Sequence, residues 1–156
     1  MQQGELASPE NWAAVEYLEK FCSDIQLLDQ KIRFTGIADY GGKLQASIYR
    51  RDLSPLMTKE ETKQYALQTV FRARTRGGFK SKIGEQRYAV SVYDRLIRST
   101  IVISHPDEYR SLYFLISLDI DCDYPAIIEK KVLPNILRNR PILFEKTSKM
   151  SAKYAV

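Results

Sequence analysis

One long helical segment separates two groups of strand-like runs, and it restricts the possible folds more than any other feature of the chain. The segment starts Thr58-Lys-Glu-Glu61, which places a hydroxyl and a carboxylate at the spacing of a capping box. Residues then recur at helical spacing until Gly77 and Gly78, a pair that favours a helix end. The pattern predicts a helix from Thr58 to about Arg74 or Arg76, roughly 25 Å long at ~1.5 Å per residue.

The segment before this helix has the pattern of a β-hairpin. Ile32–Ala38 and Leu44–Tyr49 alternate with period two, as strands with two different faces do. Gly41 and Gly42 lie between the two runs, and a two-residue hairpin turn favours glycine because its central residues need positive φ. Residues 50–57 then form a linker to the long helix.

Three more strand-like runs follow the helix, at residues 87–93, 96–103 and 111–118. The last of them, Ser111–Leu118, is the most apolar run of the chain, as expected for a central strand that is covered on both faces. Short turns between neighbouring runs make the strands antiparallel.

A helix is expected at each end of the domain. The first covers residues 9–29, with Ser8 as its N-cap and Pro9 in its first position. The last begins at Tyr124-Pro125, and Pro134 is expected to kink or shorten it. These patterns divide the chain into an N-terminal tail (1–8), a single domain (9–137) and a basic C-terminal extension (138–156).

The element order, helix, two strands, helix, three strands, helix, indicates an α+β sandwich of two or three layers. Five strands at ~4.8 Å spacing give a sheet roughly 19 Å wide, so the long helix can carry the chain from one edge to the other. If the apolar fifth strand pairs with the first strand at the centre, the strand order is 2-1-5-4-3. The first and last helices then cover the face opposite to the long helix.

This element order, the Gly-Gly hairpin and the capped crossover helix resemble the roadblock family, within the profilin-like and longin-like group. More narrowly, Ile32–Ile37 (Ile-Arg-Phe-Thr-Gly-Ile) and Gly41–Leu44 (Gly-Gly-Lys-Leu) look like segments of roadblock-like proteins of ammonia-oxidising archaea. The resemblance covers residues 11–137.

The resemblance implies a non-catalytic module that forms a homodimer through its crossover helix and the neighbouring edge strand. Such modules are platforms, often for small GTPases or for signalling and motor assemblies. Carried onto this chain, the implied dimer interface comprises the outer helix face and the third strand: Tyr65, Gln68, Thr69, Arg72, Tyr88, Val90 and Val92. A valine- and tyrosine-rich edge strand is one that self-pairing would cover.

A basic run at the end of the helix is the sharpest charge feature: Arg72, Arg74, Arg76, Lys80 and Lys82, with no acidic residue among them. It is a candidate site for an acidic protein partner. Phosphates or nucleic acid are the second possibility, with Phe79 available for stacking. The third is a solvated helix end whose cations complement the helix dipole.

No other motif carries specific chemistry. Asp119, Asp121 and Asp123 alternate as in a calcium loop, but the glycine and the glutamate of that loop are missing, so strand termination and helix capping are expected instead. Cys22 lies in a helical stripe and is expected to be a small buried hydrophobe. We therefore expect no catalytic residues, no metal, no cofactor and no enzymatic activity.

Length and charge leave several kinds of partner open. The 156 residues carry a net charge of +5, which permits an acidic partner without requiring nucleic acid. Nothing approaches the roughly 20 apolar residues of a membrane span, so a cytoplasmic protein with no membrane partner is expected. A small-ligand sensor, with its ligand between sheet and helix, is an alternative to the dimeric scaffold.

Overall fold

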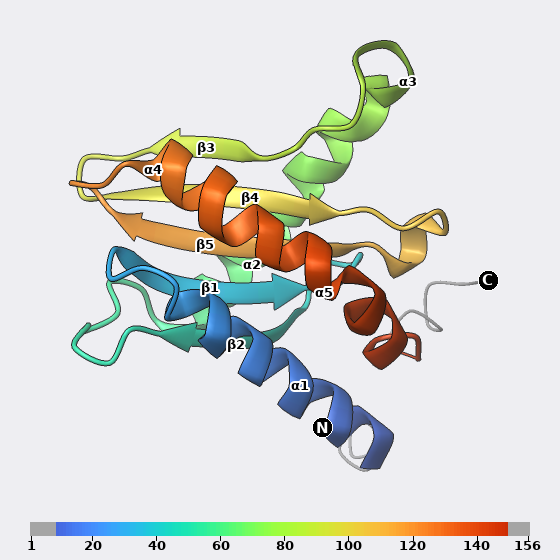
Figure 1. Cartoon of the computed structure of the whole chain (residues 1–156), viewed down its shortest axis with the longest axis horizontal. Coiled ribbons are helices and arrows are strands. Elements are labelled where there is room, and N and C mark those ends of the chain that lie inside the picture. The colour runs from blue at the N-terminus through green and yellow to red at the C-terminus, as the bar shows by residue number, and fades with distance from the viewer. Residues whose placement is uncertain (1–8, 150–156) are drawn as a thin grey trace.

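The computed structural model describes residues 9–149, which form a five-stranded antiparallel sheet between helices (Figure 1). The strand order β2-β1-β5-β4-β3 confirms the predicted topology. The expected N-terminal tail (1–8) and the expected cap at Ser8 lie outside the described residues. In chain order the elements are α1 (Pro9–Gln26), β1 (Ile32–Ala38), β2 (Leu44–Tyr49), α2 (Lys59–Arg76), α3 (Lys80–Ile83), β3 (Ala89–Val92), β4 (Leu96–Ile103), β5 (Leu112–Asp119), α4 (Tyr124–Ala126) and α5 (Leu133–Lys146).

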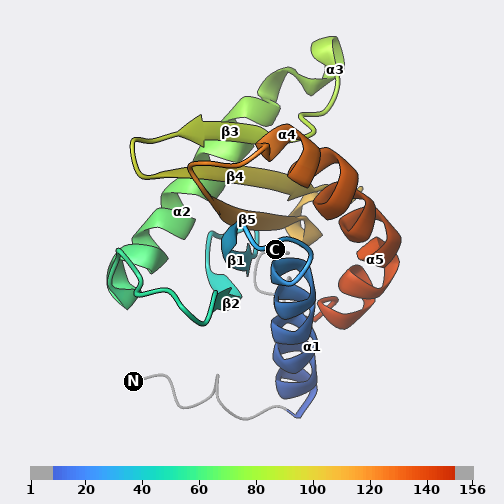
Figure 2. The same cartoon turned by 60° about the vertical axis from the view of Figure 1, so that its left-hand side comes forward.

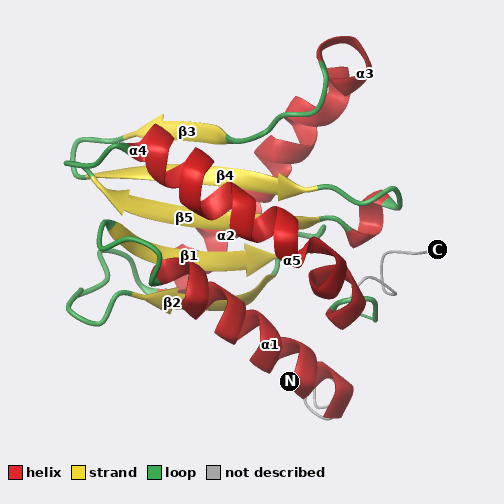
Figure 3. Cartoon of the chain, in the orientation of Figure 1, coloured by secondary structure: helices red, strands yellow, loops and turns green. Residues whose placement is uncertain are grey.

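The molecule has three layers. Figure 2 shows α2 on one face of the sheet and α1 with α4 and α5 on the other, which confirms the predicted placement of the first and last helices. Figure 3 shows how the strands form the middle layer, with every helix outside it. Each face of the sheet has its own hydrophobic core.

The larger core lies between the sheet and the helices α1 and α5. The Phe21 ring of α1 meets the Phe114 ring of β5 edge-on, with 5.8 Å between the ring centroids. Cys22 is fully buried beside them, which confirms it as a small core residue. Burial raises the pKa of the Cys22 thiol to about 12, because a thiolate is poorly solvated in an apolar core.

The smaller core lies under α2. Val70 and Ala73 of the helix pack on Phe34, Tyr113 and Leu115 of the two central strands. The capping box fixes where this helix begins, because Glu61 N–H donates to Thr58 Oγ1 (3.1 Å) and Thr58 N–H donates to Glu61 Oε1 (2.9 Å). The predicted helix start is thereby confirmed.

The chain remains helical beyond the predicted end of the long helix. α2 ends at Arg76, but Gly77 has φ −68° and the chain continues through a 3₁₀ turn (Gly77–Phe79) into α3. The helical stretch ends only at Gly84, whose φ of +90° an ordinary side chain rarely adopts.

The β1–β2 turn is longer than the predicted two-residue turn. It spans residues 39–43, because the buried Asp39 carboxylate accepts the backbone N–H groups of Gly41 and Lys43, each at 3.0 Å. Only Gly42 has positive φ (+84°) within this turn. Backbone hydrogen bonds also close this turn, because Gly42 N–H donates to the Asp39 carbonyl and Asp39 N–H donates to the Lys43 carbonyl, each at 3.0 Å. The Asp39 carboxylate therefore supports a backbone turn that is longer than the expected one.

The last helix extends into the segment that was expected to be a basic extension. A π-helical segment (Ile127–Val132) joins α4 to α5 just before Pro134. Because proline has no N–H and crowds the preceding turn, a wider turn accommodates it. The helix runs past residue 137, since α5 continues to Lys146 and its Leu143 is fully buried in the larger core. The basic extension expected from residue 138 therefore starts as helix, and residues 150–156 lie outside the described residues.

None of the helices within residues 9–149 combines the length and the apolar character needed to cross a bilayer.

Candidate interaction surface

The side chains of α2 point in three directions, because successive residues of a helix are about 100° apart. One row faces the sheet and is buried: Thr62, Ala66, Thr69, Val70 and Ala73. A second row faces the β3 edge, and a third faces the β1–β2 hairpin. The rows that flank the buried one decide what the helix can present to a partner.

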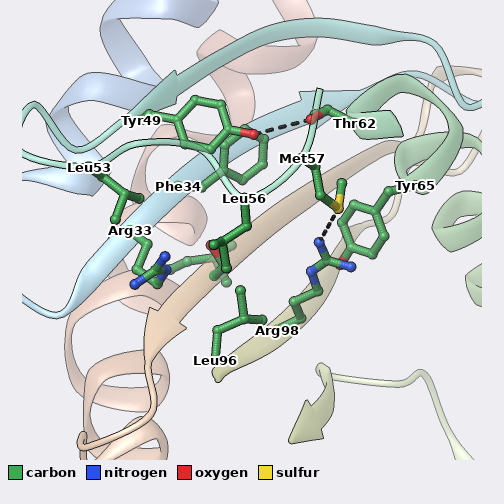
Figure 4. A pocket seen from close by; sticks show the side chains of 12 residues that line it. Arg33, Phe34, Tyr49, Leu53, Leu56, Met57, Thr62, Tyr65, Leu96 and Arg98 are labelled. Carbon is green, nitrogen blue, oxygen red and sulfur yellow. Dashed lines mark hydrogen bonds between the residues drawn. The ribbon is translucent and has the colours of Figure 1, made fainter. Parts of the chain in front are cut away.

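A groove separates α2 from the edge of the sheet. Its central contact is a cation–π stack, in which the Arg98 guanidinium lies 3.7 Å from the centroid of the Tyr65 ring. Arg98 Nη2 also lies 2.9 Å from Met57 Sδ, so the linker before α2 helps to hold the guanidinium (Figure 4). The groove has a volume of about 110 Å³ and is lined by Tyr65, Thr69, Arg72, Arg76, Ala89, Ser91, Tyr93, Arg98 and Thr100.

The predicted helix residues of the dimer interface divide between surface and interior. Gln68 and Arg72 lie on the solvent-facing part of α2, and Tyr65 is half-buried along the groove. The placement of Thr69 on the outer face is wrong, because its exposed fraction is only 5%. Thr69 is three residues after Ala66 and four before Ala73, so it belongs to the row that faces the sheet.

The predicted β3 residues lie on the other face of the sheet from α2. Tyr88 and Val90 pack against the larger core, and Val92, at the end of the same alternating row, is 62% exposed. The structure therefore does not bring these three residues together with Tyr65 and Arg72. The residues that do face α2 are Ala89, Ser91 and Tyr93.

β3 itself presents a free edge. Among the described strands it pairs only with β4, through the register Ala89 with Thr100 to Val92 with Ile97. Tyr93 follows β3 and is also exposed. An exposed strand edge with apolar side chains is a template for pairing with another strand.

The structure divides the predicted basic run between two sides of α2. Arg72 and Arg76 line the groove beside β3. Arg74 points the opposite way and lies 3.7 Å from the centroid of the Tyr40 ring, with Nη2 donating to the Tyr40 hydroxyl at 2.6 Å. Lys80 lies on the same side as Arg74, and Lys82 is exposed on α3. The five cations do not form one continuous patch.

An open cleft of about 570 Å³ lies beyond Arg74, between the end of α2 and the end of β4. Its walls carry charges of both signs, Arg74 and Lys80 against Glu85 and Glu108. Tyr113 forms part of its floor, and burial raises the pKa of this phenol to about 12, although the Arg74 guanidinium acts in the opposite direction. The mixed charges give the cleft no clear preference for anions.

A second cavity lies beneath the linker before α2, where Leu53, Leu56 and Met57 cover the sheet (Figure 4). The Tyr49 hydroxyl and Thr62 Oγ1 are 3.1 Å apart at its margin. Its volume is about 30 Å³, which is room for about one water molecule. The cavity beneath the linker is therefore too small to hold the ligand of a sensor domain.

The three alternating aspartates have structural partners. Asp119 Oδ1 accepts from Arg33 Nη1 at 3.0 Å, and Asp119 Oδ2 accepts from Arg50 Nη1 at 2.9 Å. Asp121 pairs with Lys31 at 3.0 Å. Asp123 accepts from Ala126 N–H, which confirms the predicted helix cap. Within residues 9–149, no group of three or more His, Cys, Asp or Glu side chains is arranged to hold a metal ion.

Replacing Asp119 by asparagine is expected to lower the free energy of unfolding by about 2 kcal/mol at neutral pH. The side chains of Arg33, Arg50 and Asp119 are only 14–21% exposed. The variant therefore leaves the Arg33 guanidinium without its carboxylate in a poorly solvated place, and leaves Arg50 with Asp52 alone. Urea denaturation measures the loss. Asp121→Asn is the matched control, since the Asp121 side chain is 74% exposed and its loss should have a much smaller effect on stability.

The difference between wild type and Asp119→Asn should also depend on pH. Burial tends to raise the pKa of Asp119, but the hydrogen bonds from Arg50 and Arg33 outweigh it and hold the pKa below its usual 3.8. A lowered pKa stabilises the folded state at pH values above the unfolded pKa. The stabilisation should disappear as pH falls through the folded pKa, and equal losses at neutral and strongly acidic pH would contradict this role.

No protein-family model matches the chain, and no curated protein matches it. Solved structures do match. A Roadblock/LC7 domain from Streptomyces avermitilis has a TM-score of 0.62 at 9% identity, with 81% of this chain and 97% of that chain covered. The gliding protein MglB from Thermus thermophilus has a TM-score of 0.62 at 14% identity, with 92% and 95% covered. An MglB structure with a tetrameric arrangement has a TM-score of 0.63 at 14% identity, with 92% and 94% covered.

These similarities establish the fold. The chain has the α+β architecture of Roadblock/LC7 structures, with the five-stranded antiparallel sheet in the order 2-1-5-4-3. At 9–14% identity, the likeness extends to the arrangement of elements and not to individual surface residues.

Proposed function

We propose that this protein is a non-catalytic interaction module of the roadblock family that forms a homodimer and acts as a scaffold. The observation that carries the proposal is the free β3 edge beside the α2 groove. A relation to roadblock-like proteins of ammonia-oxidising archaea is part of the same proposal, on the short segments around β1 and the hairpin.

The proposed contact joins β3 of one copy to β3 of a second copy in antiparallel orientation, and sets the two α2 helices side by side. Gln68 and Arg72 are available along α2, and Tyr65 lies beside them in the groove. Tyr88, Val90 and Val92 then flank the junction on the other face of the joined sheets. Such pairing would satisfy the free backbone groups of β3 and bury Val92, which is 62% exposed in one copy.

The proposed scaffold role includes an acidic protein partner or a small GTPase. The net charge of +5 favours an acidic partner, and the exposed cations Arg74 and Lys80 lie on the side of α2 away from the β3 groove. The MglB structure with a tetrameric arrangement is an example of assembly by a protein of similar fold.

The two alternatives receive less support from the geometry. A small-ligand sensor needs a cavity larger than the ~30 Å³ enclosed between sheet and linker. A nucleic-acid groove needs cations along one track, whereas Arg72 and Arg74 lie on opposite sides of α2.

The purified protein is expected to have the mass of a dimer in multi-angle light scattering at tens of micromolar. The expected cause is burial of the β3 edge and of exposed apolar side chains in a self-complementary contact. A monomer mass at that concentration would reject the homodimer and leave the scaffold role to a different surface.

A further inference from the structure

The edge strand β3 has an exposed apolar site at each of its two ends. Before the strand, a helical tip (residues 77–84) carries Phe79, which is 70% exposed, and Ile83, which is 84% exposed. After the strand, Tyr93 is 49% exposed in the β3–β4 turn (residues 93–95). Figure 1 shows the tip extending past β3 at the start of the strand, and the turn at its opposite end.

The tip does not need its apolar side chains for its own fold. Within the described chain, no side chain from Gly77 to Ile83 is buried. A methyl group built at Gly77 or Gly78 would meet no atom within 4 Å. Exposed apolar groups of this kind mark an interaction site, and the tip points to the side of the molecule where β3 has its free edge (Figure 2).

An antiparallel pair of β3 strands brings the two exposed sites together. In such a pair the start of one strand lies beside the end of the other. The segment that precedes β3 in one copy therefore lies beside the segment that follows β3 in the second copy, and the two-fold symmetry makes this contact occur twice. Within one copy, the whole of β3 (Ala89–Val92) separates the tip from the turn.

The two sites also lie on corresponding sides of the sheet and carry opposite charges. Tyr93 lines the groove on the α2 side of the sheet, and the tip is the direct continuation of α2. On the tip, Lys82 is three residues after Phe79, which places both on the same side of a helical turn. In the turn, Asp94 is exposed directly after Tyr93. Among the described residues, neither Lys82 nor Asp94 has an ion-pair partner.

The strand pair alone makes a small contact. β3 contains four residues, whereas a stable interface buries about 800 Å² on each partner and takes roughly 20 residues from each side. A tip of eight residues at each end of the strand pair enlarges the contact without any change in the fold of either copy.

We propose that the tip of each copy docks on the β3–β4 turn of the second copy, with Phe79 and Ile83 against Tyr93 and Lys82 beside Asp94. The inference rests on the proposed homodimer and names the segment of each copy that reaches the other. It also divides the basic run by role, because Lys82 serves the contact between copies while Lys80 lies on the other side of α2.

The dissociation constant of the dimer tests the docking. The double variant Phe79→Ser, Ile83→Ser is expected to raise it about 50-fold, because two apolar side chains are lost from each of two symmetric contacts. Asp94→Lys is expected to raise it about 10-fold at low salt, since it places like charges together twice. Light scattering over a concentration series measures both changes.

Matched controls separate the contact from general effects of charge and apolar surface. Lys80→Gln removes a cation from the other side of the same tip, and Leu27→Ser removes an apolar side chain that is 75% exposed after α1. Both should leave the dissociation constant unchanged. Every variant should keep the far-ultraviolet circular dichroism of the wild type, because none of the replaced side chains is buried.

Cross-linking between two differently substituted proteins shows directly which copy the tip contacts. In a Cys122→Ser background the remaining native cysteine, Cys22, is fully buried. A mixture of Ile83→Cys protein and Tyr93→Cys protein, treated with a short bismaleimide, is expected to give a covalent dimer. Each protein alone should give far less, because the two tips lie at opposite ends of the strand pair and so do the two turns.

The results distinguish a failure of the docking from a failure of the homodimer. A dimer whose dissociation constant is the same in the wild type and in Phe79→Ser, Ile83→Ser overturns the docking and leaves the homodimer in place. A dimer without the mixed cross-link, or with an equal cross-link from Ile83→Cys to Ser47→Cys on β2, does the same. A wild type that is a monomer at tens of micromolar rejects the homodimer itself, and the docking with it.

Discussion

Val92→Lys is expected to convert the proposed homodimer into a monomer at tens of micromolar, with the dissociation constant raised about 100-fold. Val92 lies at the end of the edge strand β3. An antiparallel pair of β3 strands is two-fold symmetric, so the contact contains the substituted residue of both copies. Lysine on a strand edge adds charge repulsion and must remain solvated, which is how natural sheets block edge pairing. Light scattering over a concentration series measures the change.

The other edge of the sheet provides the matched control. Ser47 is an exposed residue of β2, which pairs only with β1 among the described strands. Ser47→Lys should leave the dimer intact. If Ser47→Lys were a monomer and Val92→Lys a dimer, the interface would lie at β2 instead of β3. Ser47→Lys should unfold at the temperature of the wild type, since the replaced side chain is exposed. Val92→Lys should lose only the concentration-dependent part of the stability, which association supplies.

The topology could be predicted because local signals and the central strand agree. The capping box at Thr58 fixed the start of α2, and its residues satisfy each other within one turn of helix. Every residue from Leu112 to Leu118 is buried, so the most apolar run had to be a central strand. Given one central strand and short turns, few strand orders remain possible.

The orientation of β3 could not be obtained from residue type. The family resemblance implied Tyr88, Val90 and Val92 as the interface residues of the third strand, which is rich in valine and tyrosine. An apolar row on an edge strand can also pack against the core of its own domain. Tyr88 and Val90 do so, because they lie against the larger core. The residues of β3 that face α2 follow from strand alternation. Once Val90 faces the larger core, Ala89 and Ser91 must point to the opposite face of the sheet, which α2 covers.

Contacts between distant segments account for the remaining differences. The stack of Arg98 on Tyr65 joins two segments that are far apart in the chain, and the position of the linker residue Met57 supports it. The extension of α5 depends on Leu143, which enters a core assembled from α1 and the sheet. No local pattern near Arg138 indicates that Leu143 is buried. The segment from Arg138 onward is basic and weakly periodic, so from sequence it resembles a tail.

Gly42→Ala is expected to destabilise the fold by about 3 kcal/mol. Gly42 has φ +84°, which an alanine adopts only with strain. Its new methyl carbon would also lie 2.9 Å from the Leu67 backbone, at Cα, and 2.9 Å from Leu67 Cδ1. The backbone atom belongs to α2, so the helix itself would have to move. Chemical denaturation measures the loss.

Two further variants separate strain from steric overlap. Gly78→Ala should change stability by less than about 0.5 kcal/mol, because its methyl group would point into open space. Combining Gly42→Ala with Leu67→Ala removes the overlap with Cδ1 but neither the overlap with the helix backbone nor the strained φ, so most of the loss should persist. Full recovery in that double variant would show that the hairpin and α2 are not held together through their backbones. Persistence would agree with a position that needs glycine both for its positive φ and for its close approach to the backbone of α2.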